Sequence, residues 1–305
     1  MSERFLVTGA LGCIGAWVVK ELVREDVPVV GFDDGPSRHR LELVMSPEEL
    51  AQVELVNGDI TNLDKLGRVL DEYEITNVIH LAAMLIPLVK ADPTRGADVN
   101  VVGTANVFEA VKARRARIGA VTYASSAAVY DAADGVRVAE DATGHPVTLY
   151  GVHKLANEGM ARVYWLDDRL PSVGLRPFIV YGPGRDTGLT ASPTLAMEAA
   201  AKGEGSRISY GGCTQLHYAP DAARAFVRAS RNAVDGAHVH NLGGATVNMT
   251  EVVAAIEAVV PEVAGKISID DRLLPFPEDF ESSLSPATPL ADGVRQTIEH
   301  FRTVG

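Results

Sequence analysis

Short apolar runs alternate with amphipathic segments along the first 180 residues of the chain. Apolar runs of strand length, bounded by polar residues or glycine, predict strands that are buried on both faces. These runs cover residues 5–7, 27–32, 53–56, 78–81, 118–124 and 173–180. Between them, residues 63–72, residues 99–112 and a segment beginning near Tyr150 show helical spacing of apolar positions. This alternation predicts a parallel sheet covered by helices on both faces.

The pattern changes after residue 180. Glycine and proline cluster between residues 182 and 193, and the short helices and strands that follow alternate irregularly. The sequence therefore predicts an α/β fold, with a doubly wound parallel sheet in residues 1–180 and a smaller α/β lobe in residues 181–305. Some segments of the second part are expected to return to the sheet domain.

Composition and charge exclude several classes of protein. The chain has 305 residues, of which 47% are hydrophobic, and this is enough for a large core. The formal net charge of −12 disfavours nucleic acid and anionic membranes as partners, because both require a basic surface. No apolar run is long enough to span a membrane and no leader segment is recognised, so a cytoplasmic location is expected. Two distant cysteines, and histidines without metal-binding spacing, predict neither a disulfide nor a metal site.

Three glycines follow the first strand and open the next helix. Gly9, Gly12 and Gly15 are spaced G-x-x-G-x-x-G, and Cys13 and Ile14 lie between the last two. In such a turn the first glycine permits a sharp bend, the second lets the backbone approach a pyrophosphate, and the third lets the helix pack closely on the strand. Because a helix N-terminus offers free N–H groups and a positive dipole end, the turn predicts a Rossmann-type dinucleotide-binding domain.

An acidic residue, Asp33, ends the second apolar run about twenty residues beyond the glycines. A carboxylate at this place accepts hydrogen bonds from the adenosine ribose and repels a 2′-phosphate, which favours NAD over NADP. Arg38, His39 and Arg40 follow closely and would offset part of the repulsion, so NADP is the less favoured cofactor.

Tyr150 and Lys154 lie four residues apart and therefore share one face of a helix. Tyrosine, with a usual pKa of about 10, is a weak base at neutral pH, and the Lys154 ammonium is expected to lower the pKa of Tyr150. A phenolate can take a hydroxyl proton while hydride leaves the same carbon for a nicotinamide. Ser126, just past a predicted strand, is placed to hydrogen-bond the reacting oxygen.

Ordered motifs run from the first strand almost to the last helix, at residues 7–15, 58–60, 78–83, 100–107, 125–126, 150–154, 180–184 and 288–293. With these motifs the chain resembles an extended short-chain dehydrogenase/reductase of the NAD-dependent epimerase/dehydratase family. The resemblance implies that Ser126, Tyr150 and Lys154 form a catalytic triad, with Tyr150 and Lys154 also contacting the cofactor. It implies a homodimer formed through helices near residues 100–113 and 150–165. It further implies cofactor contacts from Asp59, Ile60, Leu81, Ala82, Ala83, Asn100 and Pro177.

Departures from the family pattern bear on the substrate. Ala127-Ala128 stands where sugar-nucleotide 4,6-dehydratases carry an Asp-Glu pair, so elimination of water is not expected. Members that bind nucleotide sugars usually carry asparagine and arginine where this chain has Ile179 and Gln215, so two diphosphate contacts are missing. Ile179 and Gln215 are therefore predicted to line the site of a smaller substrate. Arg185 and His217 are the predicted partners of an anionic group on that substrate.

These observations lead to three hypotheses. The first is an NAD-dependent dehydrogenase acting on a secondary alcohol of a small polyol, sugar, sugar acid or hydroxy-amino acid. The second is a sugar or sugar-nucleotide epimerase that retains its NAD. The third is a non-catalytic dinucleotide-binding regulator, and the complete set of Ser126, Tyr150 and Lys154 argues against it.

Overall fold

A parallel sheet of seven strands forms the centre of the computed structural model, which describes residues 2–284 and 288–304. The order of the strands reverses on the two sides of β1, and ligands of doubly wound sheets bind at the carboxyl ends of the strands beside such a reversal. From one edge to the other the strands are β3 (Glu54–Asn57), β2 (Val29–Asp33), β1 (Phe5–Thr8), β4 (Asn77–His80), β5 (Val121–Ala124), β7 (Ser172–Arg176) and β11 (Ala237–Asn241).

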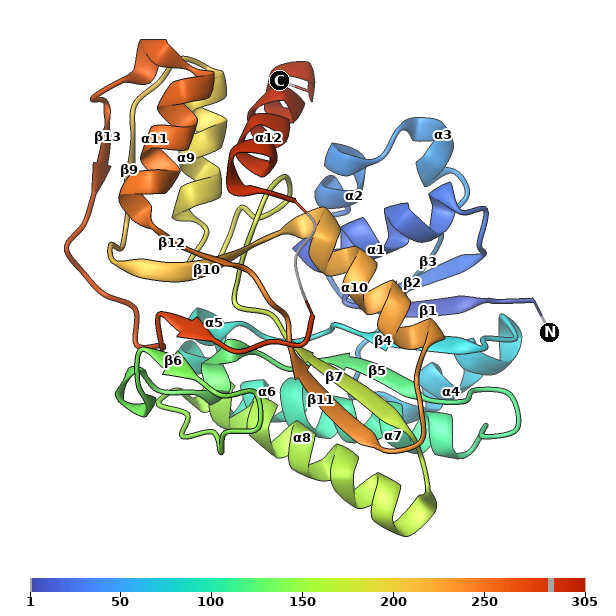
Figure 1. Ribbon diagram of the computed structural model, residues 1–305. Helices are drawn as coiled ribbons and strands as arrows, with labels where there is room; N and C mark the ends of the chain where they lie inside the picture. The colour runs from blue at the N-terminus through green and yellow to red at the C-terminus, as the bar shows by residue number, and fades with distance from the viewer. Residues whose placement is uncertain (1, 285–287, 305) are drawn as a thin grey trace.

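Helices cover both faces of this sheet, which confirms the predicted fold class (Figure 1). One face carries α1 (Cys13–Arg24) and α10 (Ala219–Arg231). The other face carries α4 (Leu63–Glu72), α7 (Gly103–Lys112) and α8 (Leu149–Asp168). The helix predicted at residues 63–72 is present with those bounds, since Leu66, Val69 and Leu70 form a buried stripe. The remaining elements of this domain are α2 (His39–Val44), α3 (Pro47–Leu50), α5 (Ile86–Ala91), α6 (Pro93–Ala97) and the π-helix Asp98–Val102.

The smaller lobe has a separate apolar core. Its three-stranded sheet, in the order β12-β10-β8, consists of β8 (Ile179–Tyr181), β10 (Cys213–Tyr218) and β12 (Ala245–Asn248). Two short paired strands, β9 (Ser206–Ile208) and β13 (Ile267–Ile269), lie beside α9 (Ser192–Ala201) and α11 (Met249–Val259), and α12 (Leu290–Val304) packs against these two helices. A further pair joins β6 (Arg137–Val138) to β14 (Asp279–Phe280).

The single strand predicted at residues 173–180 is wrong, because the run forms two strands in two sheets. β7 pairs with β5 and β11 in the central sheet, whereas β8 pairs with β10 in the lobe. The strands separate at Pro177, which has no N–H to donate to a ladder. The chain returns to the central domain in α10 and β11, so that the lobe is built from separate stretches of sequence (Figure 1).

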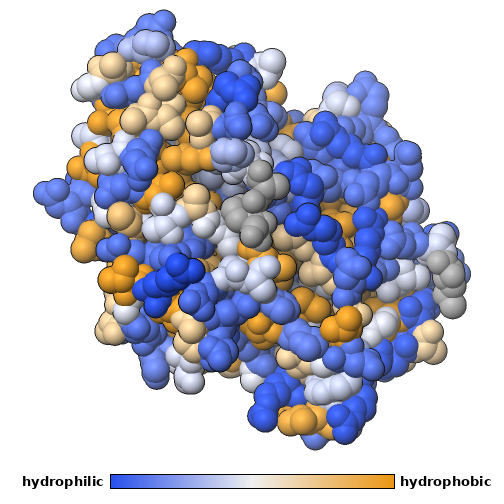
Figure 2. Space-filling view, in the orientation of Figure 1, coloured by the Kyte–Doolittle hydropathy of each residue, from blue (hydrophilic) through white to orange (hydrophobic). Residues whose placement is uncertain are grey.

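Polar side chains dominate the part of the surface over α2 and α3, at the upper right of Figure 2. Apolar and polar side chains are interspersed over α9 and α11, at the upper left. None of the helices in the part of the chain that the structure describes is long and apolar enough to cross a membrane.

Candidate active site

A cavity of about 680 Å³ lies between the carboxyl ends of the central strands and the smaller lobe. It is lined by most of the residues that the sequence analysis assigned to a site. These are Gly9, Gly12, Cys13, Ile14, Gly15, Asp33, Ile60, Leu81, Ala82, Ala83, Ser126, Tyr150, Lys154, Pro177, Ile179 and Arg185.

The glycine turn has the close backbone packing that a pyrophosphate site requires. Gly9 has a φ of +71°, and a Cβ on it would lie 2.6 Å from the backbone nitrogen of Ala82. A Cβ on Gly15 would lie 2.1 Å from the carbonyl oxygen of Gly9. No side chain caps the N-terminus of α1, so the first N–H groups of this helix can bind an anion.

Asp33 fixes the loops beside the glycine turn, where the adenosine of the cofactor is predicted to lie. Its Oδ2 accepts a hydrogen bond from the N–H of Leu11 at 3.0 Å, and its Oδ1 accepts one from the N–H of Gly35 at 2.9 Å. Because a carboxylate oxygen has two lone pairs, each oxygen can still accept a ribose hydroxyl.

The basic residues that follow Asp33 are already engaged. Arg40 binds the carboxylate of Asp186 through Nε at 3.0 Å and Nη2 at 2.6 Å, and His39 contacts the same carboxylate at 2.7 Å. The guanidinium of Arg40 also donates to the carbonyl oxygen of Leu11 at 3.0 Å. These contacts occupy two of the three basic side chains that could have accommodated a 2′-phosphate, and the third, Arg38, is paired with Glu42 at 2.8 Å. This agrees with the predicted preference for NAD.

The three predicted catalytic residues converge at the other end of the cavity. Thr148 caps α8 by accepting the N–H of Gly151 at 3.0 Å, which places Tyr150 and Lys154 on the first turns of the helix. The side chains of Ser126 and Tyr150 both line this cavity, and interaction with the Ser126 hydroxyl acts to lower the pKa of the Tyr150 phenol. Lys154 Nζ lies 5.5 Å from the centre of the Tyr150 ring and donates to the carbonyl oxygen of Ala124 at 2.7 Å.

Burial dominates the ionisation of both groups on α8. It raises the pKa of the Tyr150 phenol above its usual value, and the interaction with Ser126 and the charge of Arg185 offset this only in part. Burial lowers the pKa of Lys154 to about 8, although the carboxylate of Glu158 opposes the shift. The prediction that Lys154 lowers the pKa of Tyr150 is therefore wrong for the cofactor-free protein, because removal of the phenol from water has the larger effect.

A buried ion pair that the sequence analysis missed connects the catalytic elements. Arg176, at the end of β7, donates to the Glu158 carboxylate through Nε at 2.7 Å and Nη2 at 2.6 Å, and both side chains are 8% exposed. Ser125, the neighbour of Ser126, donates its hydroxyl to Glu158 at 2.5 Å. Glu158 lies four residues after Lys154, so helical spacing alone could have placed it on the same face of α8.

Two residues predicted to contact the cofactor support its cavity from behind. Asp59 accepts hydrogen bonds from the N–H and hydroxyl of Thr61 at 2.8 and 2.7 Å and from Arg95 at 2.7 Å. Asn100 is 1% exposed and holds the backbone of Met84, accepting its N–H at 2.7 Å and donating to its carbonyl oxygen at 3.0 Å. Neither side chain lines the cavity, because each is consumed by these local bonds.

Two residues predicted to contact the substrate also lie outside the cavity. Gln215 is buried and donates its amide to the Asp279 carboxylate and to the carbonyl oxygen of Phe280. His217 is buried and accepts the N–H of Phe178 at 3.2 Å. Both residues belong to β10, the middle strand of the lobe sheet, whose side chains are covered by neighbouring elements.

Within residues 2–284 and 288–304, no three His, Cys, Asp or Glu side chains are grouped so that they could hold a metal ion.

Comparisons with known proteins agree with this geometry. Residues 5–243 match the sequence model of the NAD dependent epimerase/dehydratase family. The chain is 32% identical over 312 residues to the UDP-glucose 4-epimerase of Mycolicibacterium smegmatis, covering 98% of each chain. It is 37% identical over 182 residues to the UDP-glucose 4-epimerase of Azospirillum brasilense, covering 59% of this chain and 50% of that protein.

Solved structures share the fold over almost the whole chain. The UDP-glucose 4-epimerase of Thermus thermophilus in complex with NAD is 25% identical and has a TM-score of 0.82, covering 99% of this chain and 100% of that one. The L-threonine dehydrogenase of Clostridium difficile is 20% identical and has a TM-score of 0.84, covering 99% and 98%.

The burial of Tyr150 predicts its titration. In the cofactor-free protein, the difference in phenolate absorbance between the wild type and Tyr150→Phe should appear only above about pH 10, because burial disfavours the charged form. Ultraviolet titration measures this difference, since the other tyrosines cancel. A phenolate that forms near neutral pH would show that the Lys154 charge outweighs burial.

The ion pair predicts a stability cycle. Glu158→Leu should lower the free energy of unfolding by about 3–5 kcal/mol, because it leaves the Arg176 charge buried without a partner. Glu158→Leu combined with Arg176→Met should recover most of that loss, as measured by chemical denaturation. Exposed ion pairs contribute less than about 1 kcal/mol. If Glu158→Leu lowered the free energy of unfolding by less than that, the pair would not behave as a buried one.

Proposed function

The chain belongs to the NAD-dependent epimerase/dehydratase family, and from this premise we propose that it oxidises a secondary alcohol of a small sugar acid or related hydroxy acid. The observation that carries this proposal is the charge distribution in the cavity. Among the guanidinium groups that line it in the described residues, Arg40 is paired with Asp186 and Arg95 with Asp59, whereas Arg185 has no carboxylate partner.

Arg185 is suited to hold the carboxylate of such a substrate. Its Nη2 donates to the hydroxyl of Thr190 at 3.0 Å, which fixes the side chain, while its Nε is buried without a hydrogen-bond partner. Arg185 and Tyr150 line the same cavity, and the charge of Arg185 acts to lower the pKa of Tyr150. The lining beside them includes the apolar Phe178, Ile179 and Phe276. A substrate with one anionic group and a short carbon chain fits this surface better than a nucleotide diphosphate does.

The catalytic residues then have defined roles. Ser126 orients the reacting hydroxyl by a hydrogen bond, and Tyr150 as phenolate accepts the proton of that hydroxyl. Bound NAD supplies the acceptor for the hydride that leaves the same carbon. Loss of the proton and the hydride converts the secondary alcohol to a ketone. Lys154, fixed on the carbonyl oxygen of Ala124, supplies positive charge beside the Tyr150 ring.

A sugar-nucleotide 4-epimerase is the second candidate. It is supported by the 32% identity to the Mycolicibacterium smegmatis UDP-glucose 4-epimerase over 98% of both chains. Such a reaction uses the same removal of hydride, followed by its return to the other face of the carbon. The lack of asparagine at Ile179 and of arginine at Gln215 weighs against a diphosphate in the cavity.

The protein should oxidise substrates that carry a carboxylate, and Arg185 should determine its KM for them. With purified protein and added NAD, we expect NADH to form with a panel of aldonates and uronates, and Tyr150→Phe should abolish it. Arg185→Gln should raise KM for the acid about 10- to 100-fold, because it removes a charge-assisted contact, and should change KM for the corresponding neutral polyol little. NADH absorbance measures each rate.

A matched control is Arg68→Gln, since Arg68 is an exposed arginine on α4, outside the cavity. This variant should leave both KM values unchanged. Conversion of UDP-glucose to UDP-galactose without net NADH, and no oxidation of any acid, would contradict the proposal and favour the second candidate.

The outer face of α8 supports the homodimer expected from the family resemblance. Leu149, Val152, Val163 and Leu166 are 46–52% exposed, which is unusual for large apolar side chains on one helix face. Together with the small Ala156 and Gly159 between them, they follow the alternating spacing of three and four residues that helices use to pack against each other. We propose that two copies of the chain pair through the apolar stripe of α8 that consists of Leu149, Val152, Ala156, Gly159, Val163 and Leu166.

A charge in the stripe should disrupt the dimer. Val163→Glu is expected to convert the protein to monomers, because pairing would bury two carboxylates close together. Light scattering during size-exclusion chromatography gives the mass directly. Val304→Glu, which changes a similarly exposed valine at the end of α12, is the control and should leave the mass unchanged. A monomeric wild type, or a dimeric Val163→Glu variant, would rule out this interface.

A further inference from the structure

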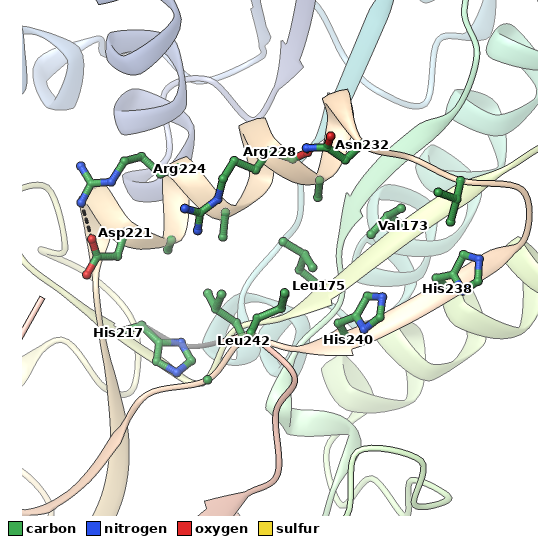
Figure 3. A pocket seen from close by; sticks show the side chains of 16 residues that line it. Val173, Leu175, His217, Asp221, Arg224, Arg228, Asn232, His238, His240 and Leu242 are labelled. Atoms are coloured by element: carbon green, nitrogen blue, oxygen red, sulfur yellow. Dashed lines mark hydrogen bonds and ion pairs between the residues drawn. The ribbon is translucent and has the colours of Figure 1, made fainter. Parts of the chain in front are cut away.

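A second cavity lies beneath α10, at the edge of the central sheet (Figure 3). It has a volume of about 240 Å³ and shares no lining residue with the cofactor cavity. In Figure 3, α10 lies above it and the strands β7 and β11 lie below. His217 lies at one end, and His238 and His240 lie at the other.

The cavity exists because α10 presents small side chains to the sheet at this place. α10 packs over β4, β5 and β7 and contributes Ala222, Ala225 and Ala229 to the lining. Val173 and Leu175 of β7 supply apolar surface on the opposite side. Protein interiors are normally close-packed, so three alanines above two aliphatic side chains leave space that a longer side chain would fill.

Arg228, at the rim of this apolar cavity, has a guanidinium group that is not paired with a carboxylate in the described residues. Arg228 has no carboxylate within 4.0 Å among residues 2–284 and 288–304, although the chain as a whole has a net charge of −12. The neighbouring Arg224, in contrast, is paired with Asp221 and Glu21. Asp221 also accepts the N–H of Thr288 at 2.8 Å, so this carboxylate of the lining is already satisfied.

The imidazole rings of His238 and His240 line one end of the cavity. His238 and His240 alternate on β11, and their rings stack with centroids 6.3 Å apart and planes 13° apart. His238 Nε2 lies 3.0 Å from the carbonyl oxygen of Asp235, and His240 Nδ1 lies 3.3 Å from the hydroxyl of Ser283 and 3.9 Å from Glu140. The rings are thereby fixed at the end of the cavity where Asn232 lies, whereas the Arg228 guanidinium lies over the middle of the cavity and points toward the His217 end (Figure 3).

We propose that this second cavity binds a small organic carboxylate, with its apolar body against Val173, Leu175 and Leu242 and its carboxylate on Arg228. A volume of about 240 Å³ is large enough for a small organic molecule, since a cavity of about 150 Å³ lined by aliphatic and aromatic side chains can hold benzene. Arginine matches a carboxylate through two parallel N–H groups. The proposal does not depend on the reaction catalysed in the other cavity.

The test uses benzoate as the probe and benzyl alcohol as its neutral counterpart, with the full-length protein saturated with NAD. All variants are made in an Arg185→Gln background, which removes the carboxylate site proposed for the other cavity. In this background calorimetric titration should show one saturable benzoate site, and benzyl alcohol should bind at least about tenfold more weakly, since it lacks the charge-assisted contact. Arg228→Gln should weaken benzoate about tenfold or more and leave benzyl alcohol unchanged. Ala229→Leu should remove binding of both compounds by filling the cavity.

Arg68→Gln is again the matched control, because it removes one exposed helix arginine outside the second cavity; its benzoate affinity should equal that of the Arg185→Gln protein. Thermal unfolding of each variant verifies that the fold is intact. Absence of saturable benzoate binding, or benzoate affinity that neither Arg228→Gln nor Ala229→Leu changes, would overturn the proposal.

Discussion

The buried pairing of Arg176 with Glu158 is the interaction on which the arrangement of the proposed catalytic residues Ser126, Tyr150 and Lys154 depends. Three elements meet at this pair: β7 through Arg176, α8 through Glu158, and the end of β5 through Ser125. A buried ion pair of this kind adds little net stability compared with apolar residues, but its loss leaves a charge without water or partner. The pair therefore ties the chain at Ser126 to the helix that carries Tyr150 and Lys154, and it penalises any arrangement that separates them.

The pairing of charged side chains also determines the properties of the rest of the cavity. The cavity is rich in ionisable groups, yet Arg40 and Arg95 are neutralised by Asp186 and Asp59. Lys154 is buried, and removal of its ammonium group from water disfavours the charged form and lowers its pKa. Arg185 is left with unused hydrogen-bonding capacity, and the proposed substrate class follows from that one group. Recognition in this protein thus depends on which cations are already satisfied, more than on how many are present.

Much of the fold and of the cofactor site could be predicted from sequence because those features are local. The glycine turn, Asp33 and the spacing of Tyr150 and Lys154 each depend on a few neighbouring residues and on the period of one element. The failures concern contacts between distant parts of the chain. Gln215 was assigned to the site because members that bind nucleotide sugars carry an arginine at its place, and His217 was assigned as a partner for an anionic group. The neighbours β8 and β12, together with residues 279–280, decide which side chains of this strand are covered. Glu158 was within reach of sequence reasoning, whereas Arg176 as its partner was not, since only the packing of β7 beside α8 brings them together.

The division of the two sheets at Pro177 has a consequence for how such a protein can acquire a new specificity. The chain leaves the central domain after β7, comes back in α10 and β11, and leaves it again toward β12. The smaller lobe is consequently not formed by one contiguous stretch of sequence. One recombination point in the sequence would combine parts of the central domain and of the lobe from two different proteins. To transfer a whole lobe from a relative, both of its sequence stretches, before α10 and after β11, would have to be exchanged together. Divergence by substitution within loops that already face the cavity is the shorter evolutionary route, and it leaves the hydride-transfer machinery untouched.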